Sequence, residues 1–149
     1  MPGQVDLVLN VKGGRYQQVA LPLAENDDGI VELMLEKVNE DPKWAALANI
    51  CVQADSHGDQ VCLRFQHAGR GSQQLQAKLV SGTESKLLTS DDLPGQFAIG
   101  KAVRIEMRVR PGSVWFRIGG RRPITRTVPF SPRLLSLGCS SAVCKARLT

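Results

Sequence analysis

The sequence predicts an all-β fold, an antiparallel β-sandwich of the jelly-roll type. Apolar residues alternate with charged residues from Val103 to Arg110, which is the period of a strand with one buried and one solvated face. Pro111 presets the first turn angle and Gly112 accepts a positive φ, so this strand should fold back on Val114–Ile118 as a hairpin. About ten such short segments recur at roughly 8 to 12 residue spacing, which is typical of a sandwich or barrel.

The N-terminal segment predicts a second hairpin. Apolar residues alternate over Val5–Val11, Lys12–Arg15 supplies a turn with two glycines, and Tyr16–Leu21 continues on the far side. We expect this hairpin to occupy about residues 1–28, and the polar segment Glu25–Gly29 to form a loop. The apolar spacing of Ile30–Val38 fits a helix and a strand equally well, so periodicity leaves that segment open.

The rest of the chain continues the pattern of short apolar segments and polar turns. The remaining candidate elements are the apolar run Trp44–Val52, the turn Asp55–Asp59, the alternating strands Val61–Gln66 and Leu75–Val80, the polar loop Gly82–Asp92, and the C-terminal segments Leu134–Leu137 and Val143–Leu148. We found no fixed-length repeat or low-complexity tract that would suggest another architecture.

Length and composition favour one domain, residues 1–149. The chain has 149 residues, 42% of them hydrophobic, without an interior break in composition, so it is long enough to bury its own core. Charge is unevenly distributed: residues 1–100 hold 8 Lys and Arg against 13 Asp and Glu, whereas residues 101–149 hold 11 against 1. The basic C-terminal third permits an anionic partner without requiring one.

Location is predicted from what the sequence lacks. There is no basic leader followed by an apolar segment, and no stretch approaches the roughly 18 apolar residues of a membrane span. A chain of this length needs no disulfide stapling, so we interpret the four cysteines as reduced thiols, although a disulfide is compatible with their number. We therefore expect a cytoplasmic protein, which unconventional secretion could still export.

The order of several segments carries a resemblance to a known family. The segments are Ile50–Val52, Gly58–Gln60, Val61–Gln66, Leu79–Ser81, Gln96–Val103, Val114–Ile118 and the tail Leu135–Val143. Their succession, from roughly Val31 to Leu148, resembles the galectins, small β-sandwich lectins made in the cytosol without a signal peptide. The resemblance implies two packed sheets with a sugar-binding groove on one of them, as in other jelly rolls of the concanavalin type.

The departures fall on the residues that read galactose in that family. The family's sugar-contacting His and Asn coincide with Arg64 and Gln66, its Arg with Ala68, and its later Asn with Val80 or Ser81. The stacking Trp has no counterpart between Ser81 and Asp92. The resemblance therefore implies the scaffold of a lectin with an altered carbohydrate-binding set, because fold does not carry function with it.

A polar set remains in the expected groove. By alternation Arg64, Gln66 and Lys78 should project into it, with Glu84 and Lys86 near its rim. A guanidinium fork and an amide supply directional donors to anionic oxygens, whereas the simpler interpretation is a solvated strand face. We expect a non-catalytic binding module that binds a protein partner or an altered, anionic glycan here.

Two further surfaces give alternative functions. A basic stripe is expected on the opposite sheet, formed by Arg104, Arg108, Arg110, Trp115, Arg117, Arg121 and Arg122. It could grip phosphates and stack a base, which would make the chain a non-specific nucleic-acid binder, or it could simply be a charged outer face. The N-terminal hairpin could instead offer a sheet edge for assembly with a partner or as a homodimer.

Catalysis and metal binding have little support. A nucleophile pair could be built from Cys51 or Cys62 with His57 or His67, but no third orienting group accompanies it. The same residues lack a Cys-x-x-Cys knuckle for zinc. We therefore expect no enzyme, no metal and no cofactor.

Overall fold

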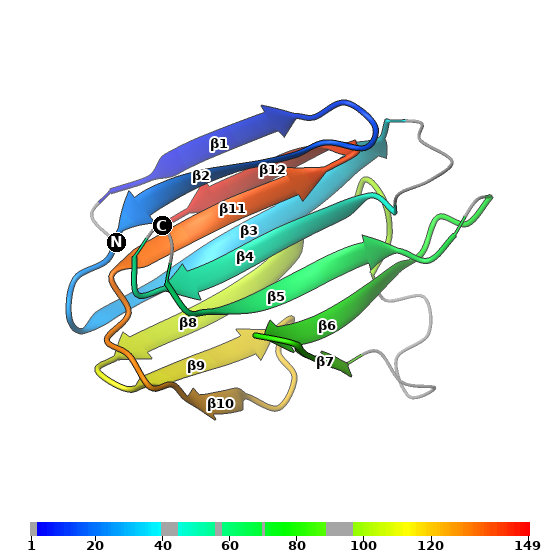
Figure 1. Cartoon of the computed structure of the whole chain (residues 1–149). Helices are drawn as coiled ribbons and strands as arrows, with labels where there is room; N and C mark the ends of the chain where they lie inside the picture. The colour runs from blue at the N-terminus through cyan, green and yellow to red at the C-terminus, as the bar shows by residue number, and fades with distance from the viewer. Residues whose placement is uncertain (1–2, 40–44, 56–57, 70, 89–96) are drawn as a thin grey trace.

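The computed structural model describes residues 3–39, 45–55, 58–69, 71–88 and 97–149, and these form two antiparallel sheets packed face to face (Figure 1). The described residues contain strands and turns but no helix, so the predicted all-β sandwich is confirmed. Sheet A has the strand order β1-β12-β3-β8-β9-β10, and sheet B has the order β2-β11-β4-β5-β6-β7.

Sheet A consists of β1 (Val5–Asn10), β12 (Ala142–Leu148), β3 (Asp27–Val38), β8 (Val103–Arg110), β9 (Ser113–Ile118) and β10 (Ile124–Thr127). Sheet B consists of β2 (Tyr16–Pro22), β11 (Leu134–Ser140), β4 (Leu47–Gln53), β5 (Gln60–His67), β6 (Leu75–Ser81) and β7 (Glu84–Leu87). The chain passes from one sheet to the other several times, so strands distant in sequence lie side by side in each layer.

The core lies between the two sheets because both supply alternate apolar residues to it. Phe116 and Ile105 of sheet A and Phe65 and Leu137 of sheet B are at most 2% exposed. The rings of Phe65 and Phe97 meet edge to face, with centroids 5.4 Å apart. Complete burial of one such side chain contributes about 1.5–3 kcal/mol, so this interface supplies most of the driving force for folding.

The predicted hairpin of β8 and β9 is present with its turn. Gly112 has a φ of 74°, which glycine adopts without strain, and Val109 pairs with Val114 on either side of the turn. The ambiguous segment Ile30–Val38 is a strand, and it starts earlier than expected, at Asp27. This segment lies between β12 and β8, where it pairs with a strand on each side. Strand alternation there buries residues such as Val31 on one face and leaves Ile30 half-buried on the other.

The structure corrects the predicted N-terminal hairpin. Both strands exist, but β1 pairs with β12 in sheet A and β2 pairs with β11 in sheet B. The intervening turn carries the chain around the core, since Val11 at its start is fully buried. β11 and β12 change sheets in the same way at Ser141, whose φ is 53° and whose Oγ accepts a 2.9 Å hydrogen bond from the Gly14 amide. Alternation predicted the strands, but it could not tell which neighbours they pair with.

The structure also corrects the expectation of reduced cysteines. Cys51 pairs with Cys62, directly opposite it in the register of β4 and β5, and Cys139 pairs with Cys144 where β11 passes into β12. Spacings of 11 and 5 residues give no sign of this proximity, because it arises from the strand register. The pairs remove the cysteines as a reason for a cytoplasmic location. No helix in the described part of the chain is long and apolar enough to cross a membrane.

Candidate ligand-binding face

The outward face of sheet B carries a row of polar side chains on three neighbouring strands, with a glycine next to them on a fourth. Gly138 of β11 pairs with Asn49 of β4, Asn49 pairs with Arg64 of β5, and Arg64 pairs with Lys78 of β6. These positions alternate with core residues such as Leu63, so their side chains project away from the core. The register thus brings residues far apart in sequence into one line.

Hydrogen bonds hold this row in place. Arg64 Nε donates to Asn49 Oδ1 at 3.0 Å, and the Asn49 residue is only 3% exposed. Lys78 Nζ donates to Gln66 Oε1 at 3.3 Å. Because the Arg64 bond uses only Nε, the two Nη groups keep their donors for a ligand, and the guanidinium is oriented before any ligand arrives.

An aromatic ring lies at one end of the row. Tyr16, at the start of β2, is 49% exposed, and a Cβ placed on Gly138 would overlap its hydroxyl group. The Tyr16 hydroxyl also accepts a 3.4 Å hydrogen bond from Asn49 Nδ2. Glycine at position 138 therefore makes room for the ring to lie against the sheet, where its exposed face can stack on an apolar surface.

The floor beside this row contains polar atoms without partners. Ser136 pairs with Cys51 in the register, next to the disulfide, and the Ser136 side chain is fully buried. Among the described residues, Ser136 Oγ and Gln53 Oε1 are shielded from water and form no hydrogen bond. Buried polar groups are usually satisfied, so these two atoms have capacity for a hydrogen bond with an enclosed water molecule.

Charge distinguishes the two outer faces. On the outward strand positions of sheet B, Arg64 and Lys78 are accompanied by neutral residues and no carboxylate. On sheet A four cations are held in ion pairs: Arg117 with Glu106 at 2.6 Å, Arg110 with Asp28 at 2.7 Å, Lys145 with Glu36 at 2.9 Å and Arg147 with Asp6 at 3.0 Å. The described outward strand positions of sheet B therefore carry positive charge without a carboxylate on the same face, whereas sheet A interleaves charges of both signs.

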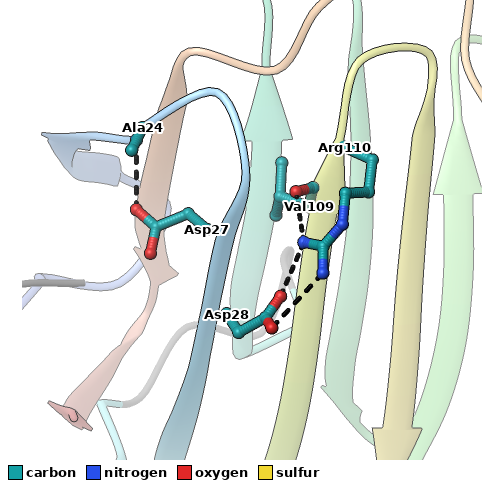
Figure 2. A network of polar contacts seen from close by, with 5 residues as sticks. All are labelled: Ala24, Asp27, Asp28, Val109 and Arg110. Carbon is teal, nitrogen blue, oxygen red and sulfur yellow. Dashed lines mark hydrogen bonds and ion pairs between the residues drawn. The ribbon is translucent and has the colours of Figure 1, made fainter.

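Figure 2 shows one of the sheet A pairs, in which both Nη atoms of Arg110 reach the Asp28 carboxylate. The hydrogen bond from Arg110 holds the pKa of the Asp28 carboxyl below its ordinary value of 3.8. In the same way the hydrogen bond from Arg147 lowers the pKa of Asp6. These carboxylates stay ionised over a wider pH range and keep neutralising the arginines beside them.

The predicted groove set is therefore only partly brought together. Arg64, Gln66 and Lys78 lie within one hydrogen-bonded neighbourhood. Glu84 and Lys86 do not join it, because the expected loop contains β7, whose register pairs Lys86 with the core residue Leu79 and Glu84 with Ser81. Their side chains therefore lie on the opposite side of sheet B from Lys78.

Sequence reasoning missed Asn49, Tyr16 and Gly138. Asn49 had a signal, since it is a polar residue inside the apolar run around Ile50, and such a residue needs a hydrogen-bond partner. Tyr16 had none, because its approach to Gly138 depends on β2 joining sheet B.

The predicted basic stripe is divided by the structure. Arg108 is opposite Trp115 in the register, and Arg117 follows Trp115 by two residues on β9. Their guanidinium carbons lie 4.3 and 5.6 Å from the centre of the Trp115 ring, and Arg117 also binds Glu106. Arg104 is opposite Glu32 in the register. Arg110 binds Asp28. Arg121 and Arg122 follow β9 in a turn and line a pocket away from the sheet surface. The stripe is therefore interleaved with carboxylates.

The candidate nucleophile and metal sets change as well. Cys51 and Cys62 are joined to each other, and His67 Nε2 is engaged at 2.7 Å with the Ser72 carbonyl. His57 lies outside the described residues. Within the described ranges, no three His, Cys, Asp or Glu side chains are grouped so as to hold a metal ion.

Comparison with known proteins places the fold but not a family. No protein-family model matches the chain, and neither does any curated protein. A carbohydrate-binding module from Bacillus subtilis aligns with a TM-score of 0.56 at 8% identity, over 92% of this chain and 80% of the module. A Bacillus licheniformis β-glucanase aligns with a TM-score of 0.56 at 11% identity, over 98% of this chain and 76% of the enzyme.

A galectin is also among the similar structures. Toad ovary galectin, solved with thio-digalactose, aligns with a TM-score of 0.51 at 11% identity, over 100% of both chains. At such identities these alignments show the fold alone. The chain thus has the two-sheet β-sandwich fold found in galectins, carbohydrate-binding modules and glucanases.

Proposed function

We propose that the chain is a non-catalytic binding module that holds an anionic glycan on the outward face of sheet B. The observation that carries the proposal is the pair Arg64 and Lys78, which is oriented by Asn49 and Gln66 and has no carboxylate on the same face. Similar folds include a carbohydrate-binding module and a galectin bound to thio-digalactose, which supports a sugar as the ligand class.

Each side chain has a defined part in this arrangement. The Nη groups of Arg64 bind two oxygens of a carboxylate or sulfate, and Lys78 adds a point charge beside them. The Tyr16 ring stacks on the apolar face of the next sugar unit, because its hydroxyl end is held against Gly138 at the end of the row and the residue is 49% exposed.

In the described part of the chain, the outward strand positions of sheet B do not carry the residues that glycoside hydrolysis ordinarily uses. Glycoside hydrolysis ordinarily uses two carboxyl groups about 5 to 9.5 Å apart, one as acid and one as nucleophile or base. The outward strand positions of sheet B contain no Asp or Glu in the described residues. The proposal is therefore binding without hydrolysis.

A glycan array with neutral, sialylated and sulfated galactosides tests the proposal, followed by calorimetry on the strongest hit. Arg64→Ala should weaken binding of an anionic glycan about tenfold or more, since a hydrogen bond to a charged group is worth about 1.5–3 kcal/mol. Arg104→Ala removes an exposed arginine from sheet A and is the matched control. The proposal fails if no glycan binds the folded chain, or if both variants bind a hit as tightly as the parent.

A second candidate function is assembly through β1. This strand is the outer strand of sheet A, and its Val8 side chain is 62% exposed, which is high for a valine. A second copy or a protein partner could add a strand at this edge. Sedimentation of the parent and of Val8→Lys tests the idea. A parent dimer that is lost in the variant supports it, and a parent that stays monomeric at high concentration excludes self-association.

A further inference from the structure

A pocket lies between the two sheets, lined by residues of β6, β9 and β10 and by the residue that follows β7. Figure 1 shows these strands at one side of the sandwich, β6 and β7 in one layer and β9 and β10 in the other. We call it the edge pocket. It measures about 200 Å³, and its apolar lining is supplied by Ala77, Leu88, Phe97, Ile118 and Ile124. These residues belong to the inner faces and ends of the strands, so the edge pocket is separate from the polar row on the outward face of sheet B.

Two arginines complete the lining. Arg121 and Arg122 follow Gly119 and Gly120, whose φ values of 54° and 78° fix the turn after β9. The Arg121 guanidinium lies 5.0 Å from the centre of the Phe97 ring. The turn therefore places positive charge against an apolar surface where water is partly excluded.

One donor of Arg121 has no acceptor. Arg121 Nη1 is shielded from water and forms no hydrogen bond with the described residues. The same is true of Arg126 Nε, and Arg126 follows Ile124 by two residues, on the same face of β10. A charged donor without an acceptor is costly in a place that water does not reach, so these groups favour an incoming anionic oxygen.

We propose that the edge pocket binds a small amphipathic carboxylate, whose apolar chain or ring fills the space between Ala77, Phe97 and Ile118 and whose carboxylate accepts from Arg121. The size fits, because an apolar cavity of about 150 Å³ admits a benzene ring. The lining also fits, because the apolar walls favour the hydrocarbon and the guanidinium selects an acid over a neutral alcohol. This site does not depend on the glycan site.

Methyl NMR on the full chain, labelled at the isoleucine δ1 carbons, tests the proposal with octanoate as the probe and octan-1-ol as its neutral analogue. Octanoate should shift the Ile118 and Ile124 methyls in a saturable way, and leave those of Ile50 and Ile30 unchanged. Octanoate should bind at least tenfold more tightly than octan-1-ol. Absence of shifts at Ile118 and Ile124, equal shifts at Ile50, or equal affinity for the alcohol would each overturn it.

Two substitutions separate the contributions of charge and space. Arg121→Gln should weaken octanoate at least tenfold and leave octan-1-ol unchanged, with Arg104→Gln as the charge-matched control. Leu88→Trp should fill the edge pocket and abolish binding, whereas Leu87→Trp, one residue away and 50% exposed before substitution, should not. Undiminished octanoate binding in either Arg121→Gln or Leu88→Trp contradicts the assignment, and Arg64→Ala should leave octanoate binding intact.

Discussion

Tyr16 lies directly against Gly138, so that a Cβ on Gly138 would overlap the phenol group. The two residues are 122 positions apart and meet because β2 pairs with β11. A glycine in the interior of a strand usually weakens it, so its presence here has a packing reason. The contact sets the position of the Tyr16 ring on the proposed glycan face.

Gly138→Ala should therefore destabilise the protein by about 1–3 kcal/mol, the usual cost of an overpacked contact. In a Tyr16→Ala background the same substitution should cost much less, because the opposing ring is gone. Urea unfolding of the four chains measures the coupling. Ser136→Ala is the matched control on β11: its hydroxyl is buried without a partner, so removing it should be close to neutral. Equal costs of Gly138→Ala in both backgrounds would show that the ring does not press on this glycine.

The disulfide between Cys51 and Cys62 should stabilise the outward face of sheet B. Closing a loop of this length constrains the unfolded chain and is typically worth about 2–4 kcal/mol. The double variant Cys51→Ser with Cys62→Ser should lose about that much in unfolding under oxidising conditions, and the parent should fall toward it when reduced. Intact mass after alkylation checks the premise: four alkylated cysteines in protein purified without reductant would show that the pairs do not form.

The ion pair of Asp28 and Arg110 should make part of the stability depend on acid pH. The pKa of Asp28 is lowered from 3.8 in the folded chain, so its contribution is present above that value and is lost as pH falls through the folded pKa. Asp28→Asn should accordingly be less stable than the parent at pH 7, and the difference should shrink as pH falls below 3.8 toward the lowered folded pKa. Thermal unfolding across pH measures this convergence.

An Arg110→Ala background supplies the control for that experiment, because it removes the partner seen in Figure 2. There the pH dependence of the Asp28→Asn effect should be reduced, with the weaker attraction of Arg108 remaining. A stability difference between parent and Asp28→Asn that persists unchanged at acid pH would mean that the carboxylate is not held ionised by this arginine.

Pairing on sheet A also bears on nucleic-acid binding. Neutralising the carboxylates with Asp28→Asn and Glu106→Gln releases Arg110 and Arg117, so affinity for duplex DNA should rise. The slope of log K against log salt should steepen by about 2, one unit for each added phosphate contact. Fluorescence anisotropy with labelled DNA measures both. A parent chain that already binds DNA with a steep slope, unchanged in the double variant, would show that the stripe acts despite its carboxylates.

Local patterns predicted the architecture because they report on single strands. The alternation over Val103–Arg110 and the Pro111–Gly112 turn predicted the hairpin of β8 and β9, and the structure confirms that these strands pair. Alternation also placed Arg64, Gln66 and Lys78 on one outward face. The same reasoning failed for Lys86, because the short strand β7 was interpreted as a loop and its facing was therefore unknown.

The sequence by itself determined that the chain forms short strands with one apolar face, because that pattern is local and must bury itself against a second sheet. Only the tertiary structure decided the strand neighbours, and the neighbours decided the site. Pairing β1 and β2 with different sheets brings Tyr16 to Gly138, and the register of β4 and β5 joins Cys51 to Cys62 and Asn49 to Arg64. Pairing depends on how the whole core closes, and alternation within one strand carries no information about it.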